Sequence, residues 1–206
     1  MSRAFARDQP AVVPTDTVYG LMAPIDRPAA IARIFELKGR PVDQPLAVLI
    51  GEPSELGLVA EPSPTATALA ARFWPGALTM VVEAGVGIGQ RVGAHDGTIG
   101  VRCADDELVR RITAAVGPVA TTSANVHGRP TPISAAEIAH QLTDVLVIDD
   151  GPRPAPPSAV VRVGVDGDIE VLRPGAINPE ALRQVARGPT TIPPPLTNDG
   201  ENGVRS

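Results

Sequence analysis

Hydroxyl and amide side chains gather just after apolar runs of this sequence. The members of this group are Thr15, Thr17, Thr121, Thr122, Ser123 and Asn125. In an α/β sheet, ligands bind where strands end and loops begin, so this placement has a physical meaning. Any one of these residues could instead make a turn, which is their ordinary role. Together they favour polar contacts to a small ligand at strand ends.

Cationic side chains stand at comparable strand or helix ends. They are Lys38, the only lysine of the chain, and Arg40, Arg102 and Arg173. Fixed cations stabilise the charge that accumulates on phosphate oxygens when pyrophosphate leaves a nucleotide. The alternative is solvated surface charge, and we expect that environment for Arg129 and Arg162.

Several common sites are disfavoured. The chain has no Gly-x-x-x-x-Gly-Lys motif, and Gln90 stands where the dinucleotide pattern requires its third glycine. Ser123 and His127 are not set in a Gly-x-Ser-x-Gly elbow, which disfavours a serine hydrolase. The histidines are scattered and Cys103 is the only cysteine, so the sequence predicts neither a protein-made metal site nor a disulfide.

Apolar runs predict strands that alternate with helices, and hence an α/β fold. The predicted strands are residues 11–13, 46–50, 78–82, 98–102, 119–122, 145–148, 158–163 and 169–172, the last two forming a hairpin around Asp166-Gly167. The predicted helices start at Pro28, Ser63, Asp105 or Asp106, Ser134 and Asn178, where Ser134 and Glu137 fit a capping box. Residues 15–20 and 85–97 are predicted loops.

The composition fits one domain. With 206 residues, 43% of them hydrophobic, the chain can bury a sizeable core. We expect a single domain over residues 1–187 and a disordered, Pro-rich tail over residues 188–206. The net charge of -5 disfavours a surface that binds nucleic acid throughout, and no apolar run is long enough to span a bilayer. A cytoplasmic protein is therefore expected.

Four short motifs follow one another along the chain. They are Pro14-Thr15-Asp16-Thr17-Val18-Tyr19-Gly20-Leu21, Lys38-Gly39-Arg40-Pro41, Gly100-Val101-Arg102 and Ser123-Ala124-Asn125. In order and spacing they resemble the YrdC-like family of threonylcarbamoyl-AMP synthases, over a span from about Val12 to Gly175. The resemblance implies the single-domain form of this family, with a twisted, open, mixed sheet, flanking helices and a deep concave cavity.

The resemblance also implies an activity. Such enzymes form threonylcarbamoyl-AMP and pyrophosphate from L-threonine, bicarbonate and ATP, for threonylcarbamoyladenosine modification of tRNA. ATP would arrive with Mg²⁺, and no protein-bound organic cofactor is expected. The product would pass to a tRNA threonylcarbamoyltransferase complex, while tRNA binding by this chain would be weak and no membrane would be involved.

Roles for individual residues come from the same resemblance. Lys38 and Arg40 would be catalytic. The L-threonine contacts would be Thr15, Arg102, Thr121 and Ser158. The ATP contacts would be Arg40, Gln44, Thr98, Ser123, Asn125, Thr131 and Arg173, and no residue would bind a metal. Residues 15, 40, 102, 123 and 173 would therefore meet in a single pocket.

Two departures from the family pattern and two alternative functions are open at this point. Ala159 stands where the family usually has threonine, and Leu49 stands where some members have a polar threonine contact. One alternative is a YrdC-like paralogue that binds RNA or a nucleotide without this activity. The other is formation of a carbamoyl adenylate, as in one domain of hydrogenase maturation proteins, which a free domain disfavours.

Overall fold

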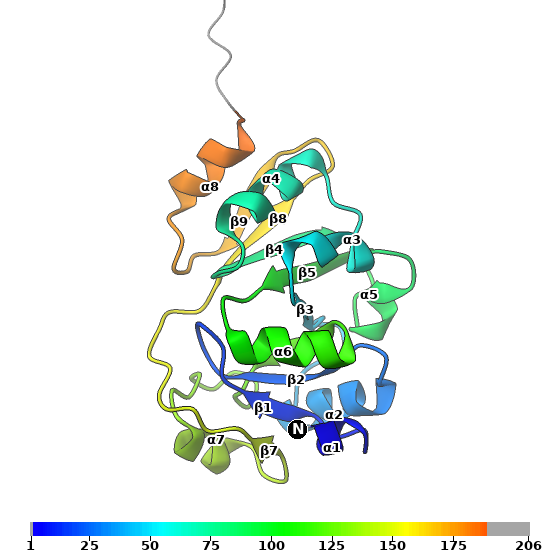
Figure 1. The fold of residues 1–206 in the computed structure, drawn as a ribbon, viewed down its shortest axis with the longest axis vertical. Coiled ribbons are helices and arrows are strands. Elements are labelled where there is room, and N and C mark those ends of the chain that lie inside the picture. The colour runs from blue at the N-terminus through cyan, green and yellow to red at the C-terminus, as the bar shows by residue number, and fades with distance from the viewer. Residues whose placement is uncertain (1, 189–206) are drawn as a thin grey trace, which may run out of the picture.

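The computed structural model describes residues 2–188, so all but the first residue of the tail predicted for 188–206 lies outside the described residues. Within this range nine strands form one mixed sheet in the order β7-β1-β2-β6-β3-β5-β4-β8-β9 (Figure 1). The strands are β1 (Ala11–Val13), β2 (Gly20–Pro24), β3 (Ala47–Ile50), β4 (Leu78–Glu83), β5 (Thr98–Cys103), β6 (Val119–Ser123), β7 (Leu146–Val147), β8 (Ala159–Val163) and β9 (Ile169–Arg173).

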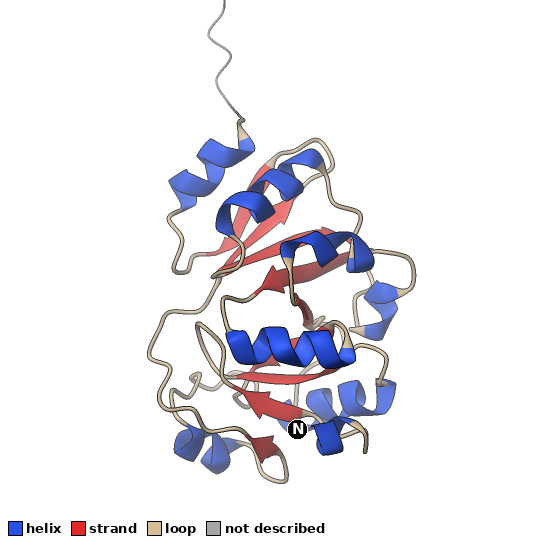
Figure 2. Cartoon of the chain, viewed as in Figure 1, coloured by secondary structure: helices blue, strands red, loops and turns tan. Residues whose placement is uncertain are grey.

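Helices flank this sheet (Figure 2). They are α1 (Ser2–Phe5), α2 (Pro28–Lys38), α3 (Leu56–Val59), α4 (Pro64–Phe73), α5 (Ile88–Arg91), α6 (Glu107–Val116), α7 (Ala135–Gln141) and α8 (Pro179–Ala186), with a 3₁₀ turn η1 at Pro53–Glu55. The predicted α/β class and the twisted mixed sheet are confirmed. No helix within residues 2–188 has the length and apolar character needed to cross a bilayer.

One face of the sheet is covered by helices along much of its width. Because successive side chains of a strand point to opposite faces, each strand supplies residues to two layers. The larger hydrophobic cluster joins Ile34 of α2, Leu69 of α4 and Leu182 of α8 to strand residues such as Val48 and Met80. These helices therefore share the burial of one face.

The opposite face is covered only in part. A second cluster joins Val109 and Ile112 of α6 to Met22, Leu49 and Val119. These three strand residues alternate with members of the first cluster, so α6 lies on the face opposite to α2. The second cluster contains no residue of β4, β5 or β8, and there the same face borders a cavity.

Local sequence explains where α4, α6 and α7 begin. The side chains of Ser63, Asp106 and Ser134 each accept a hydrogen bond from the backbone N–H three residues later, as predicted for N-caps. The capping-box prediction is wrong in one respect, since the Glu137 carboxylate accepts from the Ile133 N–H instead of that of Ser134. The helix begins where predicted nonetheless.

Some elements differ from those predicted. Strand β2 is absent from the prediction because its Gly20 and Pro24 are poor strand formers, and it exists because β1 and β6 pair with it on either side. The loop predicted for residues 85–97 contains the short helix α5. The strand predicted as buried at 145–148 is β7 at the edge of the sheet, where Leu146 is exposed.

The segment after β9 packs closely on the start of β8. A Cβ atom added to Gly175 would lie 2.5 Å from Pro157 O and from Ser158 C. These are backbone atoms, which cannot rotate away as a side chain can. A glycine is therefore required at residue 175 by space alone.

This close approach makes a prediction. Replacing Gly175 by Ala should lower the free energy of unfolding by about 1–3 kcal/mol, because the added methyl overpacks two backbone segments. Gly57→Ala is the matched control, since nothing lies within 4 Å of a Cβ there, and it should change stability by less than about 1 kcal/mol. Urea unfolding measures both. Equal stabilities of the two variants would contradict the close approach.

Candidate active site

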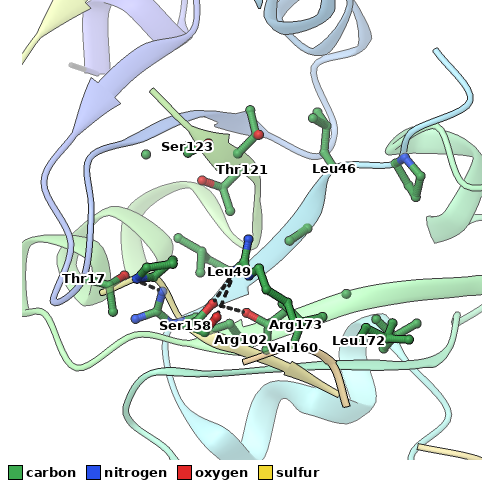
Figure 3. Close-up of a pocket in the computed structure, with 18 of the residues that line it drawn as sticks. Thr17, Leu46, Leu49, Arg102, Thr121, Ser123, Ser158, Val160, Leu172 and Arg173 are labelled. Carbon is green, nitrogen blue, oxygen red and sulfur yellow. Dashed lines mark hydrogen bonds between the residues drawn. The ribbon is translucent and has the colours of Figure 1, made fainter. Parts of the chain in front are cut away.

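A cavity of about 570 Å³ lies on the partly covered face of the sheet. Its floor consists of alternate strand residues: Ala47 and Leu49 of β3, Thr79 and Val81 of β4, Thr98, Gly100 and Arg102 of β5, Thr121 and Ser123 of β6, and Val160 and Arg162 of β8. The strand register brings Leu49 opposite Arg102 and Val81 opposite Gly100. Figure 3 shows polar side chains from several strands turned toward this space.

The structure brings most of the residues singled out in the sequence into this cavity. Those that line it are Thr15, Thr17, Arg40, Thr98, Arg102, Thr121, Thr122, Ser123, Thr131, Ser158 and Arg173. Lys38, Gln44 and Asn125 are not among the lining residues. The expected meeting of residues 15, 40, 102, 123 and 173 in one pocket is thus observed, whereas their roles toward a ligand stay predictions.

The loop after β1 is shaped by its own hydroxyls. Thr15 Oγ1 donates to Val18 O over 2.7 Å and accepts from the Thr17 N–H over 3.2 Å. Such side-chain bonds to nearby backbone stabilise a turn without regular secondary structure. As a result, Thr15 and Thr17 are both buried, and both line the cavity.

Arg102 is held on three sides. Its Nη2 donates to Asp16 Oδ1 over 2.5 Å, its Nη1 to Thr17 Oγ1 over 2.8 Å and its Nε to Gly76 O over 2.9 Å. Burial lowers the pKa of Arg102, and the neighbouring Asp16 carboxylate opposes that shift. A guanidinium carries five N–H groups, so two of them are left for a ligand carboxylate. The fixed orientation suits bidentate binding.

The end of α2 places Lys38 and Arg40 on different sides of the polypeptide. Gly39 adopts the left-handed conformation with φ of 58°, and the Arg40 N–H returns to Phe35 O, as in a Schellman motif. Lys38 is 2% exposed, whereas Arg40 lines the cavity. The Arg40 guanidinium donates to Gln44 O and Pro45 O, so the backbone carbonyl of Gln44 orients Arg40.

Lys38 supports the Ser-x-Asn motif from behind. Its Nζ donates to Ser123 O over 2.6 Å, to Asn125 O over 2.5 Å and to Asn125 Oδ1 over 3.2 Å. These contacts use all three N–H groups of the ammonium. Burial and, second, the charge of Arg40 lower the pKa of Lys38 to about 8. Lys38 therefore positions the end of β6 at Ser123, and its three N–H groups are all used by the protein. The catalytic role predicted for Lys38 stays a prediction.

Asn125 completes this support. Its Oδ1 accepts from Ser123 Oγ over 2.5 Å, and its amide nitrogen donates to Val126 O and Arg129 O. The Ser123 hydroxyl, which lines the cavity, is thereby held with its proton directed away from a ligand. Its oxygen is then left to accept a hydrogen bond.

Ser158 and Arg173 meet on the far wall of the cavity (Figure 3). Arg173 Nη2 donates to Ser158 O over 2.9 Å and to Ser158 Oγ over 3.3 Å. Burial lowers the pKa of Arg173, and the charge of Arg102 contributes in the same direction. Two guanidinium groups therefore lie near each other, and within residues 2–188 Arg173 forms no ion pair with a carboxylate. This corner of the cavity favours an anion.

A connection between distant strands holds the two walls together. The chain runs from β7 at one edge of the sheet to β8 near the other edge (Figure 1). Along this path Tyr19 Oη donates to Gly151 O over 2.7 Å, and Arg153 Nε donates to Thr15 O over 3.1 Å. The path ends at Pro157 and Ser158, both of which line the cavity.

Sequence reasoning missed several lining residues. Arg162 is exposed and pairs with Glu170 over 2.8 Å, as expected for a solvated charge, but it also lines the cavity. Thr79 and Asp96 also line it. A signal was present for two of them, because Thr79 and Arg162 interrupt strands that are otherwise apolar. Of the two family departures, Leu49 faces the cavity and Ala159 is fully buried in the core.

The side chains that line the cavity carry a net positive charge, which favours an anionic ligand. Four arginines line it, and Asp96 is the one acid among the described lining residues. The positive electrostatic potential of these arginines attracts carboxylates and phosphates. Within residues 2–188 no three His, Cys, Asp or Glu side chains come together in a group that could hold a metal ion.

The chain is similar to known proteins over most of its length. A family model named for Sua5, YciO and YrdC, and described as Telomere recombination, matches residues 3–175. The threonylcarbamoyl-AMP synthase of Bacillus subtilis is 36% identical over 93% of this chain, and the chain covers 56% of that protein. The putative threonylcarbamoyl-AMP synthase of Mycobacterium tuberculosis is 34% identical over 88% of this chain, which covers 85% of it.

Solved structures agree with these relatives. The crystal structure of P. abyssi Sua5 complexed with L-threonine superposes with a TM-score of 0.81 at 33% identity, over 89% of this chain and 55% of that chain. The chain thus spans about half the length of some relatives and most of the length of others. Fold, motifs and cavity together lead to one assignment: the chain belongs to the Sua5/YciO/YrdC family.

Proposed function

We propose that this chain is an L-threonylcarbamoyladenylate synthase, which forms threonylcarbamoyl-AMP and pyrophosphate from L-threonine, bicarbonate and ATP. The observation that carries the proposal is the convergence of Thr15, Arg40, Arg102, Ser123 and Arg173 in one cationic cavity. Relatives named threonylcarbamoyl-AMP synthase, and a similar structure that holds L-threonine, support it.

The reaction joins three substrates in order. The threonine amine bonds to the bicarbonate carbon with loss of water, which gives a carbamate. A carbamate oxygen then bonds to the α-phosphorus of ATP, while the bond from that phosphorus to the bridging oxygen breaks and pyrophosphate leaves with the electron pair. The product is a mixed anhydride, threonylcarbamoyl-AMP. No enzyme nucleophile is needed, so the protein contributes positioning and charge stabilisation.

In this proposal Arg102 binds the threonine carboxylate. Its three protein partners hold the guanidinium still, so little orientation entropy is lost when the ligand arrives. Thr15, Thr121 and Ser158 add hydroxyls around the amino acid. Arg102 is thus a binding residue whose geometry is set before the ligand binds.

ATP would occupy the rest of the cavity. We assign contacts to ATP to the side chains of Arg40, Thr98, Ser123, Thr131 and Arg173, which line the cavity. Gln44 and Asn125 would act on ATP by orienting Arg40 and Ser123 respectively. Magnesium would enter with ATP, on which it keeps phosphate and water ligands.

The remaining assignments follow from this activity. The adenylate is reactive toward water, so we propose that it passes to a tRNA threonylcarbamoyltransferase complex in the cytoplasm. Binding of tRNA to this chain alone would be weak, in keeping with a net charge of -5.

Substrate dependence tests the proposal directly. Pyrophosphate release from ATP should require both L-threonine and bicarbonate, because the attacking group is their joint carbamate. A coupled pyrophosphate assay in bicarbonate-depleted buffer, with each substrate restored in turn, measures this. Pyrophosphate release that does not depend on threonine would contradict the proposed synthase activity. Tight tRNA binding without an adenylate product would favour a binding paralogue, and a requirement for carbamoyl phosphate would favour the carbamoyl-adenylate alternative.

Arg40→Ala should slow turnover about 100-fold, because it removes a fixed cation from the site where phosphate charge develops. The loss of side-chain contacts should change stability by about 1 kcal/mol at most, since Arg40 is not part of the hydrophobic core. Arg33→Ala is the control: Arg33 lies on α2, the helix that precedes Arg40, and pairs with Glu36 at the surface. An Arg40→Ala enzyme of normal kcat, or one that unfolds, would refute this role.

Lys38→Met should lower the free energy of unfolding by about 1–3 kcal/mol, because buried carbonyls of Ser123 and Asn125 lose their donor. The pH dependence gives a second readout. The folded pKa of about 8 lies below the ordinary value of 10.5, so the unfolded chain binds more protons between these pH values and stability rises there with pH. Urea unfolding should show this rise in the wild type minus Lys38→Met difference, in which the titration of Cys103 cancels. A flat difference would contradict the buried ammonium.

A further inference from the structure

A hydroxyl that the proposed mechanism does not use lies in the cavity floor. Thr79 is on β4, is 8% exposed and lines the cavity. Within the described residues, its Oγ1 has one hydrogen-bond partner, Ser158 Oγ, at 2.9 Å, and either atom could be the donor. Val81, the next β4 residue on the same face, is apolar, so a polar residue at position 79 is a local exception.

Ser158 is the point where this hydroxyl meets a cation. Ser158 is 5% exposed and its Oγ also receives Arg173 Nη2 over 3.3 Å. A hydroxyl has one proton to donate and two lone pairs that accept. If Thr79 donates to Ser158, both lone pairs of Ser158 are used, and the only hydrogen-bonding capacity left on Ser158 is its own O–H group.

We propose that Thr79 is a positioning residue that makes Ser158 a hydrogen-bond donor toward the substrate. This inference rests on the proposed function and names the chemistry of one subsite. An acceptor oxygen of the ligand beside Ser158 completes this hydrogen-bond network. The N–H of Arg173, the O–H of Thr79 and the O–H of Ser158 then all have acceptors. Donation from Arg173 polarises the Ser158 hydroxyl and strengthens its own donation.

The subsite therefore selects an oxygen and rejects an amine. A substrate ammonium or N–H group would find no free lone pair on Ser158, and it would face the guanidinium groups of Arg102 and Arg173. A carboxylate or carbamate oxygen finds donors from all three residues. This orients the amino acid with its oxygens toward β8 and β9.

The side chain of Thr79 suits this positioning role because it is β-branched. Its Cγ2 methyl lies 3.4 Å from the position that a Cβ on Gly100 would take, so it packs on the bare backbone of β5. A β-branched side chain has few rotamers. Once the methyl rests on Gly100, the hydroxyl stays directed at Ser158.

Thr79→Val removes the hydroxyl and keeps the shape. The KM for threonine should rise about tenfold, because Ser158 loses its partner and can turn its proton away from the ligand. The KM for ATP should change by less than about twofold, since no ATP contact is removed. Thr79→Ser should restore most of the affinity. The matched control is Thr113→Val, where a buried threonine hydroxyl bonds to Val109 O and Arg110 O within α6, away from the cavity.

A double variant separates positioning from direct contact. In a Ser158→Ala background, adding Thr79→Val should cost little more, because Thr79 acts through Ser158. Threonine binding measured by calorimetry without ATP repeats the comparison without catalysis, so it stands even if the wild type releases no pyrophosphate and the proposed function fails. Additive effects of the two substitutions, an equal rise in the KM for ATP, or threonine affinity unchanged in Thr79→Val would each overturn the proposal.

Discussion

The structure depends on the two-residue repeat of its strands, combined with a sheet that helices cover along much of one face and only partly on the other. Alternation sends Val48, Met80 and Val101 into the core and sends Leu49, Thr79 and Arg102 to the opposite face. Where α6 packs, that second face is a small core of its own. Where no described helix packs, the same face becomes a cavity. Core and site are thus two sides of the same short strands.

This arrangement explains how cations can be held in a largely buried place. Arg102 is 7% exposed and still has an acid, a hydroxyl and a carbonyl as partners. Lys38 is satisfied by three oxygens behind the cavity wall. Unpaired, either charge would be costly to bury. With their partners in place, Arg102 lines the cavity, where we propose that it binds the threonine carboxylate, and Lys38 holds the wall that carries Ser123.

The two motif residues of the Lys-x-Arg pair therefore have different tasks, although only one residue separates them. Gly39 adopts a left-handed conformation, which ends α2 and turns the chain. Arg40 reaches the cavity, and Lys38 is enclosed on the far side of the loop at Ser123. The same division holds for Ser123, which lines the cavity, and Asn125, which supports it. Each motif places one residue in the cavity lining and one behind it as support.

The sequence itself determined most of the strands and longer helices, the N-caps at Ser63, Asp106 and Ser134 and the turn at Gly39. These features depend on residues within a few positions of one another. The likeness of four motifs to one family also identified nine residues that line a common cavity. Tertiary structure decided the rest. Strand β2 exists only through its neighbours, since Gly20 and Pro24 carry little strand preference. Likewise, only the pairing of β4 with β8 brings Thr79 to Ser158, and only the face on which β8 lies makes Arg162 a cavity residue. These contacts join residues far apart in the chain, and no local pattern encodes which face of which strand will be left open.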